Sequence, residues 1–196
     1  RVVRSGLDLV GCRCRTGGFD QHESIEFFGS KTPYLPLSER SDVQVFETNP
    51  LQEKLEVTGT VSVNIWVSSS GLDTDFTAKL LDVYPANPDY PNGYSLNVTD
   101  GIFRCKFRES WEEETLLTPQ KAYFITISLP PTSNIFAKNH RLRVDISSSN
   151  FPRFDVNPNT GENPVKAKYK VSAVNTIHHS IQHPSHLILP IISRKN

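Results

Sequence analysis

The sequence predicts an all-β protein: an antiparallel β-sandwich preceded by an irregular N-terminal arm. Three observations favour this fold class. Apolar and polar residues alternate over short segments, which is the period of a half-buried strand. Clusters of Pro, Gly, Asn and Asp separate these segments, as turns separate strands. Strong helix signals are nearly absent from the 196 residues, 14 of which are proline. We expect about eight strands in two packed sheets, a jelly roll.

Residues 1–41 are predicted to form the irregular arm or linker, and residues 42–196 the sandwich domain. The arm contains the turn-rich stretch GCRCRTGGFDQ and the proline-containing KTPYLPLSER, and neither alternates. The chain begins at Arg1 and has no Met, so we expect a fragment of a longer protein. It has no apolar run of 18 residues and starts with no signal peptide. We therefore expect a cytoplasmic protein without a membrane partner.

The period changes to two at Asp42. In the segment 55–69, valine and isoleucine occupy one face, and Ser, Asn and Trp the other. Residues 109–117 are the helix candidate of note, but Pro119 ends this segment and we favour a short turn or loop insertion. The predicted strands lie within residues 42–48, 55–69, 76–85, 101–110, 121–130, 140–149, 170–177 and 186–192.

Charge and motifs exclude several classes of function. Lys plus Arg and Asp plus Glu are 21 each, so no basic surplus favours a nucleic-acid partner. The chain lacks the G-x-S-x-G elbow, a Gly-rich phosphate loop, H-E-x-x-H and CxxC. We predict no catalytic residue, no metal and no cofactor. Cys12, Cys14 and Cys105 are an odd number with tight spacing, which favours unpaired thiols in a reducing compartment.

Four histidines near the C-terminus form the first candidate site: His178, His179, His183 and His186. Imidazoles so close in sequence can bind zinc or another transition metal. Their spacing matches no tight zinc motif, and Pro184 breaks any helix that would align two ligands. We favour a turn that leads into the final strand.

The second candidate is LDTDF, in which Asp73 and Asp75 point the same way on an extended chain. Paired carboxylates suggest a calcium ion or acid–base chemistry. Aspartates at a strand entrance more often tie a loop to nearby backbone amides. We favour this structural interpretation.

The third candidate is SSSNFPRFDVNPNTG, residues 147–161, which follows a regular strand pattern. Its prolines and asparagines, Asn150 among them, indicate a loop. It would be energetically unfavourable for a turn in contact with solvent alone to expose Phe151, Arg153 and Phe154. We expect them to contact a partner.

Aromatic residues offer a further possibility, because exposed rings stack on sugars. The candidates are Trp66, Tyr84, Tyr90, Tyr94 and Trp111. Packing within the sandwich is an equally good account of Trp66, since it lies on one face of an alternating strand.

Four long blocks in a fixed order resemble one known family. They are residues 51–85, 95–110 and 127–161, together with HPSHLILPII at 183–192. The chain resembles, over residues 42–192, the C-terminal domain of the X-Pro dipeptidyl-peptidase and cocaine-esterase-like (CocE/NonD) serine hydrolases. The FDQ at Phe19 to Gln21 is similar to the lead-in that precedes it.

This resemblance implies a jelly-roll, galactose-binding-like domain attached to an α/β-hydrolase domain, in the same or a separate chain. The Ser, Asp and His of the catalytic triad sit in that other domain, so this chain alone would not hydrolyse a substrate. It would pack on the catalytic domain and help to shape a pocket for X-Pro peptides or small esters or amides. The resemblance places Phe151, Arg153 and Phe154 in a contact loop, LDTDF in a second interface segment, and Phe76 in the pocket.

Two alternatives remain open. A stand-alone module could bind carbohydrate through loops at one end of the sandwich, on fold analogy alone. The second alternative is a structural module that promotes oligomerisation. An exposed apolar docking face would favour homo-oligomers.

Overall fold

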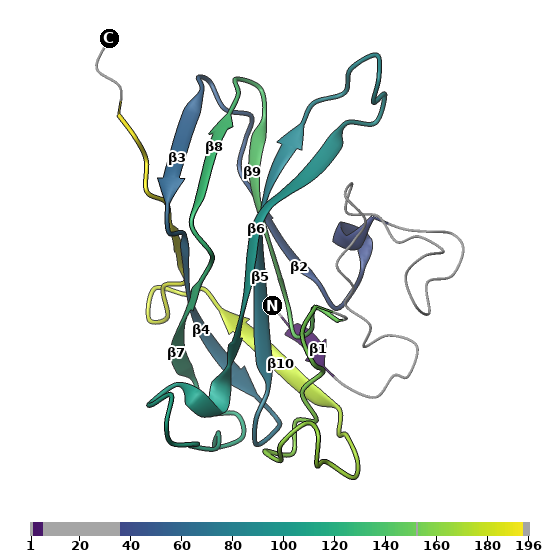
Figure 1. Cartoon of the computed structure of the whole chain (residues 1–196), viewed down its shortest axis with the longest axis vertical. Coiled ribbons are helices and arrows are strands. Elements are labelled where there is room, and N and C mark those ends of the chain that lie inside the picture. Colours follow the sequence, from purple (N-terminus) through teal and green to yellow (C-terminus); the bar gives the residue numbers. More distant parts are fainter. Residues whose placement is uncertain (1, 6–35, 152, 194–196) are drawn as a thin grey trace.

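In the computed structural model, the chain folds as an antiparallel β-sandwich (Figure 1). The structure describes residues 2–5, 36–151 and 153–193. Helical structure among these residues is limited to two 3₁₀ turns, η1 (Leu37–Glu39) and η2 (Cys105–Phe107). The strands are β1 (Val2–Ser5), β2 (Gln44–Glu47), β3 (Leu55–Gly59), β4 (Ser62–Ser69), β5 (Asp75–Tyr84), β6 (Tyr94–Arg104), β7 (Tyr123–Ser128), β8 (Thr132–Phe136), β9 (Arg141–Ser147), β10 (Ala173–His178) and β11 (His186–Ile188).

Two sheets form the layers of the sandwich. The first sheet has the order β1-β10-β4-β11, with β7 also pairing β4, and the second has the order β2-β9-β5-β6. A separate ribbon joins β3 and β8. β4 pairs with β10 at Trp66 and with β11 at Asn64. Ser185 connects these two pairings, because its hydroxyl accepts a hydrogen bond from the Trp66 amide at 2.9 Å and donates one to the His178 carbonyl.

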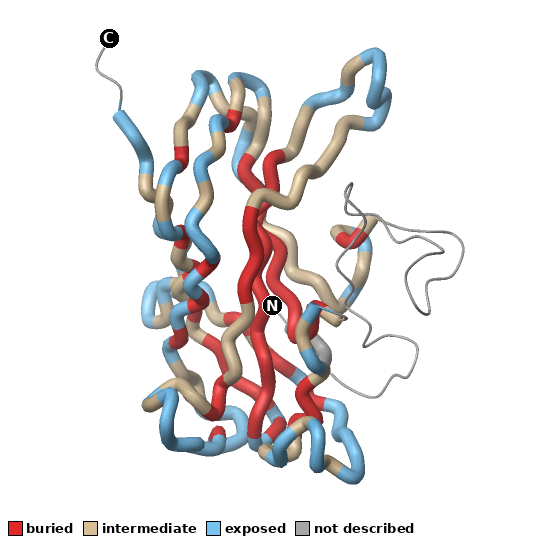
Figure 2. The backbone as a smooth tube through the Cα atoms, viewed as in Figure 1, coloured by how far each residue is buried: buried red, intermediate tan, exposed pale blue. Residues whose placement is uncertain are grey.

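The hydrophobic core lies between the two sheets (Figure 2). Alternation places Val63, Ile65 and Val67 of β4 on the inner face, where each is at most 3% exposed. Phe76 of β5 and Phe136 of β8 are fully buried in the same core. Burial of each such phenylalanine contributes about 1.5–3 kcal/mol. Most of the stability of the sheets therefore comes from this layer of side chains.

The predicted all-β sandwich is confirmed, and the described strands differ from the prediction in four places. The segment 55–69 divides into β3 and β4 at Gly59, whose φ of +133° favours glycine and whose Cβ position would approach Pro190. β6 begins at Tyr94 and ends at Arg104, so η2 replaces part of the predicted strand 101–110. β8 was not predicted, because two prolines precede it. β1 lies within the predicted irregular arm.

The remaining predictions concern the cysteines, the segment 109–117 and membrane-spanning helices, and some of them fall on residues that the structure does not describe. Cys12, Cys14 and the FDQ stretch lie outside the described residues, as does most of the arm. Cys105 is buried and free, and its burial raises the pKa of its thiol well above the usual value. Residues 109–117 form bends and no helix, as predicted. None of the helices in the described part of the chain is long and apolar enough to span a membrane.

Candidate functional site

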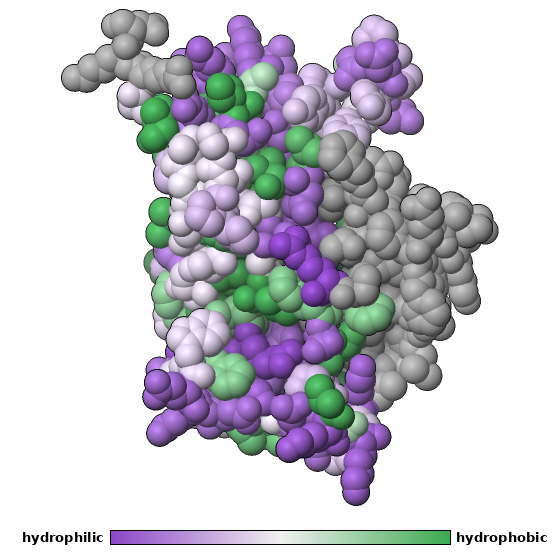
Figure 3. Space-filling view, viewed as in Figure 1, coloured by the Kyte–Doolittle hydropathy of each residue, from purple (hydrophilic) through white to green (hydrophobic). Residues whose placement is uncertain are grey.

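Three loops meet at one end of the sandwich, the lower end in Figure 1. They are residues 70–74 between β4 and β5, residues 105–122 between β6 and β7, and residues 148–172 between β9 and β10. Backbone hydrogen bonds join them: Leu72 donates to the Asn159 carbonyl at 3.2 Å and accepts from the Leu117 amide at 2.7 Å. We call this region the loop end. Its surface is largely hydrophilic (Figure 3).

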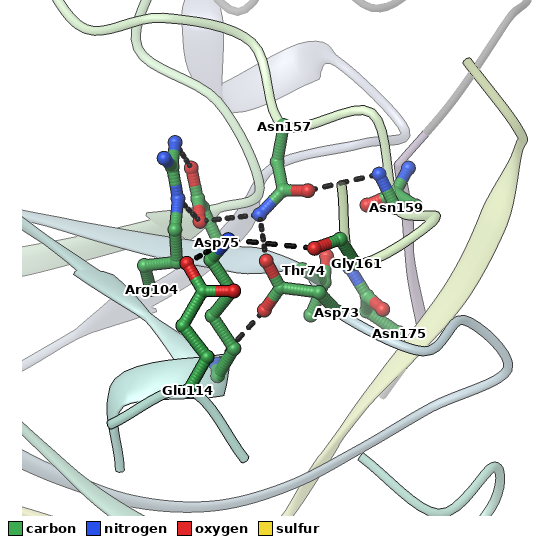
Figure 4. A network of polar contacts seen from close by, with 10 residues as sticks. Asp73, Thr74, Asp75, Arg104, Glu114, Asn157, Asn159, Gly161 and Asn175 are labelled. Carbon is green, nitrogen blue, oxygen red and sulfur yellow. Dashed lines mark hydrogen bonds and ion pairs between the residues drawn. The ribbon is translucent and has the colours of Figure 1, made fainter. Parts of the chain in front are cut away.

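Asp73 and Asp75 meet at Asn157 within the loop end (Figure 4). The Asn157 side-chain amide donates to Asp73 Oδ2 at 2.9 Å and to Asp75 Oδ1 at 2.7 Å. Its own oxygen accepts a hydrogen bond from the Asn159 amide at 2.8 Å, which determines which way the side chain faces. Both aspartates are 1% exposed. One asparagine therefore ties the 148–172 loop to the start of β5.

One cation pairs directly with these buried carboxylates, and a backbone amide binds the other. The Arg104 guanidinium donates twice to Asp75, each time at 2.9 Å, across the β5–β6 pairing. Lys106 donates through its backbone amide to Asp73 at 2.9 Å, and its ammonium group lies 2.7 Å from Glu114. Buried charges are tolerated when each has a partner of this kind.

Electrostatics within the loop end follow from burial and from these pairs. Burial raises the pKa of Asp73, and the neighbouring Asp75 raises it further, while the hydrogen bond from Asn157 opposes both effects. The hydrogen bond to Asp75 raises the pKa of Arg104. Burial thus makes the charged form of Asp73 costly in the folded protein.

A second group of hydrogen bonds holds the start of the 148–172 loop. Asn175 of β10 donates to Thr74 and to Ser148, each at 2.8 Å. Asn150 is 1% exposed and donates to Asp100 of β6 at 2.7 Å. The Phe154 amide donates a hydrogen bond to the Asn150 carbonyl at 3.2 Å, and this bond closes a turn. The base of the loop is therefore bound to β6 and β10.

The sequence-predicted contact residues lie just beyond this base. Arg153 forms an ion pair with Asp100, while its side chain remains 47% exposed and its guanidinium lies 5.5 Å from the centre of the Phe154 ring. Phe151 and Phe154 are half-buried. The structure thus brings Asn150, Phe151, Arg153 and Phe154 together on one turn.

Phe76 is placed differently from the expectation. Its side chain is fully buried between the sheets, among the core residues. A side chain with no exposed surface cannot line a pocket on a docking face, so we correct that interpretation and assign Phe76 to the core. The alternation of β5 explains the result, because Asp75 and Phe76 must point to opposite faces of the sheet.

Each buried aspartate of the pair accepts hydrogen bonds from amides or a guanidinium of another segment. Asp73 and Asp75 thus tie loops together, as the favoured interpretation expects, although the amide that Asp73 binds belongs to Lys106 of another loop. In the part of the chain that the structure describes, no group of three or more His, Cys, Asp and Glu side chains is placed to hold a metal.

The four C-terminal histidines lie elsewhere, around the β10–β11 connection. His178 and His183 have ring centres 5.4 Å apart, and His183 also packs edge-on against Trp66 at 4.7 Å. Burial lowers the pKa of His178, and a charge on His183 would lower it further. The opposite side of Trp66 contacts Phe124 at 5.5 Å. Trp66 therefore packs against its neighbours on the outer face of the first sheet.

Sequence reasoning identified the two aspartates and missed most of their partners. Arg104 lies directly opposite Asp75 in the β5–β6 pairing, so a hairpin alignment could have found this pair. Asn157 and Asn175 carry no comparable signal, because the groups to which their side-chain amides donate lie 27 to 101 residues away in sequence.

Comparison with known proteins identifies relatives of this chain. The chain is 44% identical over 161 residues to the cocaine esterase of Rhodococcus sp. (strain MB1 Bresler), covering 81% of this chain and 27% of that protein. A solved α-amino acid ester hydrolase superimposes with a TM-score of 0.77 at 33% identity, covering 88% of this chain and 28% of that one. An aminopeptidase from the archaeon Thaumarchaeota gives 0.76 at 34% identity, covering 80% and 27%.

The chain thus spans about a quarter of the length of each of these relatives. A family described as the X-Pro dipeptidyl-peptidase C-terminal non-catalytic domain matches residues 14–188. That match includes all three loops of the loop end and both sheets apart from β1. The chain belongs to this family of non-catalytic C-terminal domains, which accompany the catalytic parts of X-Pro dipeptidyl-peptidase and cocaine-esterase-like hydrolases.

Proposed function

We propose that this domain packs on an α/β-hydrolase catalytic domain through its loop end and helps to shape that domain's substrate pocket. The partner domain belongs to the same or a separate chain, and it carries the Ser-His-Asp triad that performs the hydrolysis. The parent acts on small esters or amides, or on X-Pro peptides. Its relatives, an esterase, an ester hydrolase and an aminopeptidase, support this range of substrates.

The single observation that carries the proposal is the contrast within the 148–172 loop. Its base is held rigidly by buried hydrogen bonds from Asn150, Asn157 and Asn175. Its turn nevertheless presents Phe151 and Phe154, half-buried, beside an exposed Arg153. A well-anchored loop that carries phenylalanine and arginine side chains has the composition that is typical of protein interfaces.

The loop can also bind with little loss of entropy. Ordering a mobile loop at an interface weakens association, and a loop that is already ordered avoids that cost. The buried Asp73–Asn157–Asp75 bridge supports this order through side chains other than the contact residues themselves. Shaping of a substrate pocket requires the same rigidity, since small displacements of a wall change how substrate is held.

The proposal is tested in a hydrolase that carries this domain together with its catalytic domain. Phe151→Ala and Phe154→Ala are each expected to lower the melting temperature, because each removes apolar area buried at the interface, worth about 1.5–3 kcal/mol when complete. The Michaelis constant for an ester substrate is expected to rise about fivefold or more.

Tyr90→Ala is the matched control, because Tyr90 is 52% exposed in the tip of the β5–β6 hairpin, at the opposite end of the sandwich from the loop end (Figure 1). This variant is expected to leave the Michaelis constant unchanged. Wild-type kinetics and stability in both loop variants would refute docking through the loop end.

A further inference from the structure

The two sheets approach each other closely along one side and stand apart along the other. β6 and β7 adjoin at the closed side. At the other side, β2 faces the segment that runs from β10 into β11, and a cleft of about 520 Å³ opens between them. This volume lies within the range of about 300–1,000 Å³ that is usual for small-molecule sites. We call it the lateral cleft.

The walls of the lateral cleft are apolar. Val63 and Ile65 of β4 form one wall, and Val144 and Ile146 of β9 form the other, so the cleft reaches the core of the sandwich. Sugars and nucleotides do not fit such walls, because their hydroxyl and phosphate groups would be buried without hydrogen-bond partners. An alkyl chain has no such groups and gains by leaving water.

Polar groups are confined to the mouth of the cleft, and most of them already have partners. The Thr48 hydroxyl accepts from the Leu142 amide at 3.1 Å. Both ring nitrogens of His186 are engaged, one with Asn64 at 3.2 Å and one with the Pro184 carbonyl at 3.1 Å.

Two residues decide the charge at the mouth. Glu47 is neutralised by Arg141, whose guanidinium lies 3.1 Å from its carboxylate. His179 is exposed and packs edge-on against Phe46 with ring centres 6.3 Å apart. Within the described residues its imidazole makes no hydrogen bond, so it can donate one to a ligand's head group.

We propose that the lateral cleft binds a medium-chain aliphatic carboxylate. Its alkyl chain lies between the sheets, against Val63, Ile65, Val144 and Ile146, and its carboxylate accepts a hydrogen bond from His179 at the mouth. This site is separate from the loop end and does not depend on the function proposed for that region. Burial of each further methylene strengthens binding about fourfold until the cleft is filled.

The experiment uses the chain itself and a dansyl-labelled undecanoic acid, whose emission shifts to the blue and intensifies in an apolar site. Saturable binding with one probe per chain is expected, with displacement by decanoate more effective than by octanoate. Val144→Phe fills the cleft and is expected to weaken probe binding about tenfold or more. Val174→Phe is its matched control, because Val174 lies on β10 and is 44% exposed.

His179→Phe tests the head-group contact, because it keeps a ring beside Phe46 and removes the hydrogen-bond donor, and the residue is exposed, so the fold is not at risk. The affinity for decanoate is expected to fall about five- to tenfold, while the affinity for decanol, which lacks the charge, changes little. If Val144→Phe fails to fold, as judged by its near-ultraviolet circular dichroism, Leu187→Trp fills the same cleft from β11.

Three outcomes would overturn the proposal. The first is the absence of saturable probe binding. The second is equal binding by the cleft-filling variants and Val174→Phe, which would mean that the probe adheres to exposed apolar surface. The third is an equal effect of His179→Phe on the affinities for decanoate and decanol, which would mean that His179 does not bind the carboxylate.

Discussion

The two ends of the sandwich hold their loops in different ways. At the loop end, the side-chain amides of Asn157 and Asn175 donate to groups that lie 27 to 101 residues away in sequence. At the opposite end, the β5–β6 hairpin tip is held by contacts within its own turn. Its Asn87 side chain accepts from the amides of Asp89 and Tyr90, each at 3.0 Å. The tip is a local structure, whereas the loop end depends on the whole fold.

This difference predicts which substitutions will disturb the structure most. Exposed turns of local origin lose little when one hydrogen bond is removed, since water replaces the partner. Buried networks lose much more, because the group left behind has neither a partner nor water. The conformation of the 148–172 loop, and with it the contact turn, is therefore predicted to be far more sensitive to substitution than the hairpin tip.

The largest effect is expected from Arg104→Met. This change leaves the carboxylate of Asp75, 1% exposed, without its guanidinium partner, which typically costs about 3–5 kcal/mol. Urea unfolding at neutral pH measures the loss. Arg141→Met is the matched control, because the Arg141–Glu47 pair is exposed and should contribute less than about 1 kcal/mol. Equal losses in the two variants would break the distinction between buried and exposed networks.

Asn157→Ala is expected to reduce the free energy of unfolding by about 1–3 kcal/mol, because it removes both hydrogen bonds that bridge Asp73 and Asp75. Amide hydrogen exchange is expected to accelerate through residues 148–161 more than elsewhere. Asn163→Ala is the control, since Asn163 is exposed and binds only a nearby backbone amide. Protection of the loop at the wild-type level in Asn157→Ala would show that the bridge does not order it.

The third prediction concerns pH. Burial raises the pKa of Asp73 above its ordinary value of 3.8, so ionising this group costs the folded state more than the unfolded state. Its contribution to stability is fully present below the ordinary value and is lost as pH rises through the raised pKa. The stability advantage of the wild type over Asp73→Asn should therefore be greatest in acid and should shrink toward neutral pH. Urea unfolding of both proteins at a series of pH values would detect this trend. A stability advantage of the wild type that grows with pH would contradict the raised pKa of Asp73.

The smallest effect is expected at the hairpin tip. Asn87→Ala removes two local hydrogen bonds from a turn that water can reach, so the expected loss is about 0.5 kcal/mol or less. Thermal unfolding followed by circular dichroism is sufficient to measure it. A loss as large as that of Asn157→Ala would mean that the two ends do not differ in the way proposed.

Most strands could be predicted from the sequence because alternation is a local property. Within residues 76–85 and 140–149, each side chain's face follows from its neighbours along the chain. The same rule separates Asp75 from Phe76, which sequence reasoning had grouped together. β8 shows the limit of this local rule. Two prolines precede this segment in the sequence, and it forms a strand by pairing with β3.

The candidate site was predicted in part. Asp73, Asp75, Asn150, Phe151, Arg153 and Phe154 were chosen because charged or aromatic side chains on turns need a reason to be there. Their partners were not chosen, because Asn157 and Asn175 are ordinary polar residues until the fold brings them beside buried carboxylates.

The sequence by itself determined the class of fold, the order of most strands and the family, because these depend on local alternation and on the order of long motifs. Tertiary structure decided which polar residues bind one another, which aromatic residues are exposed, and where the two sheets stand apart to form the lateral cleft. The physical reason is that pairing, burial and cavities arise between segments that are distant in the chain, and no local pattern records the distance between them.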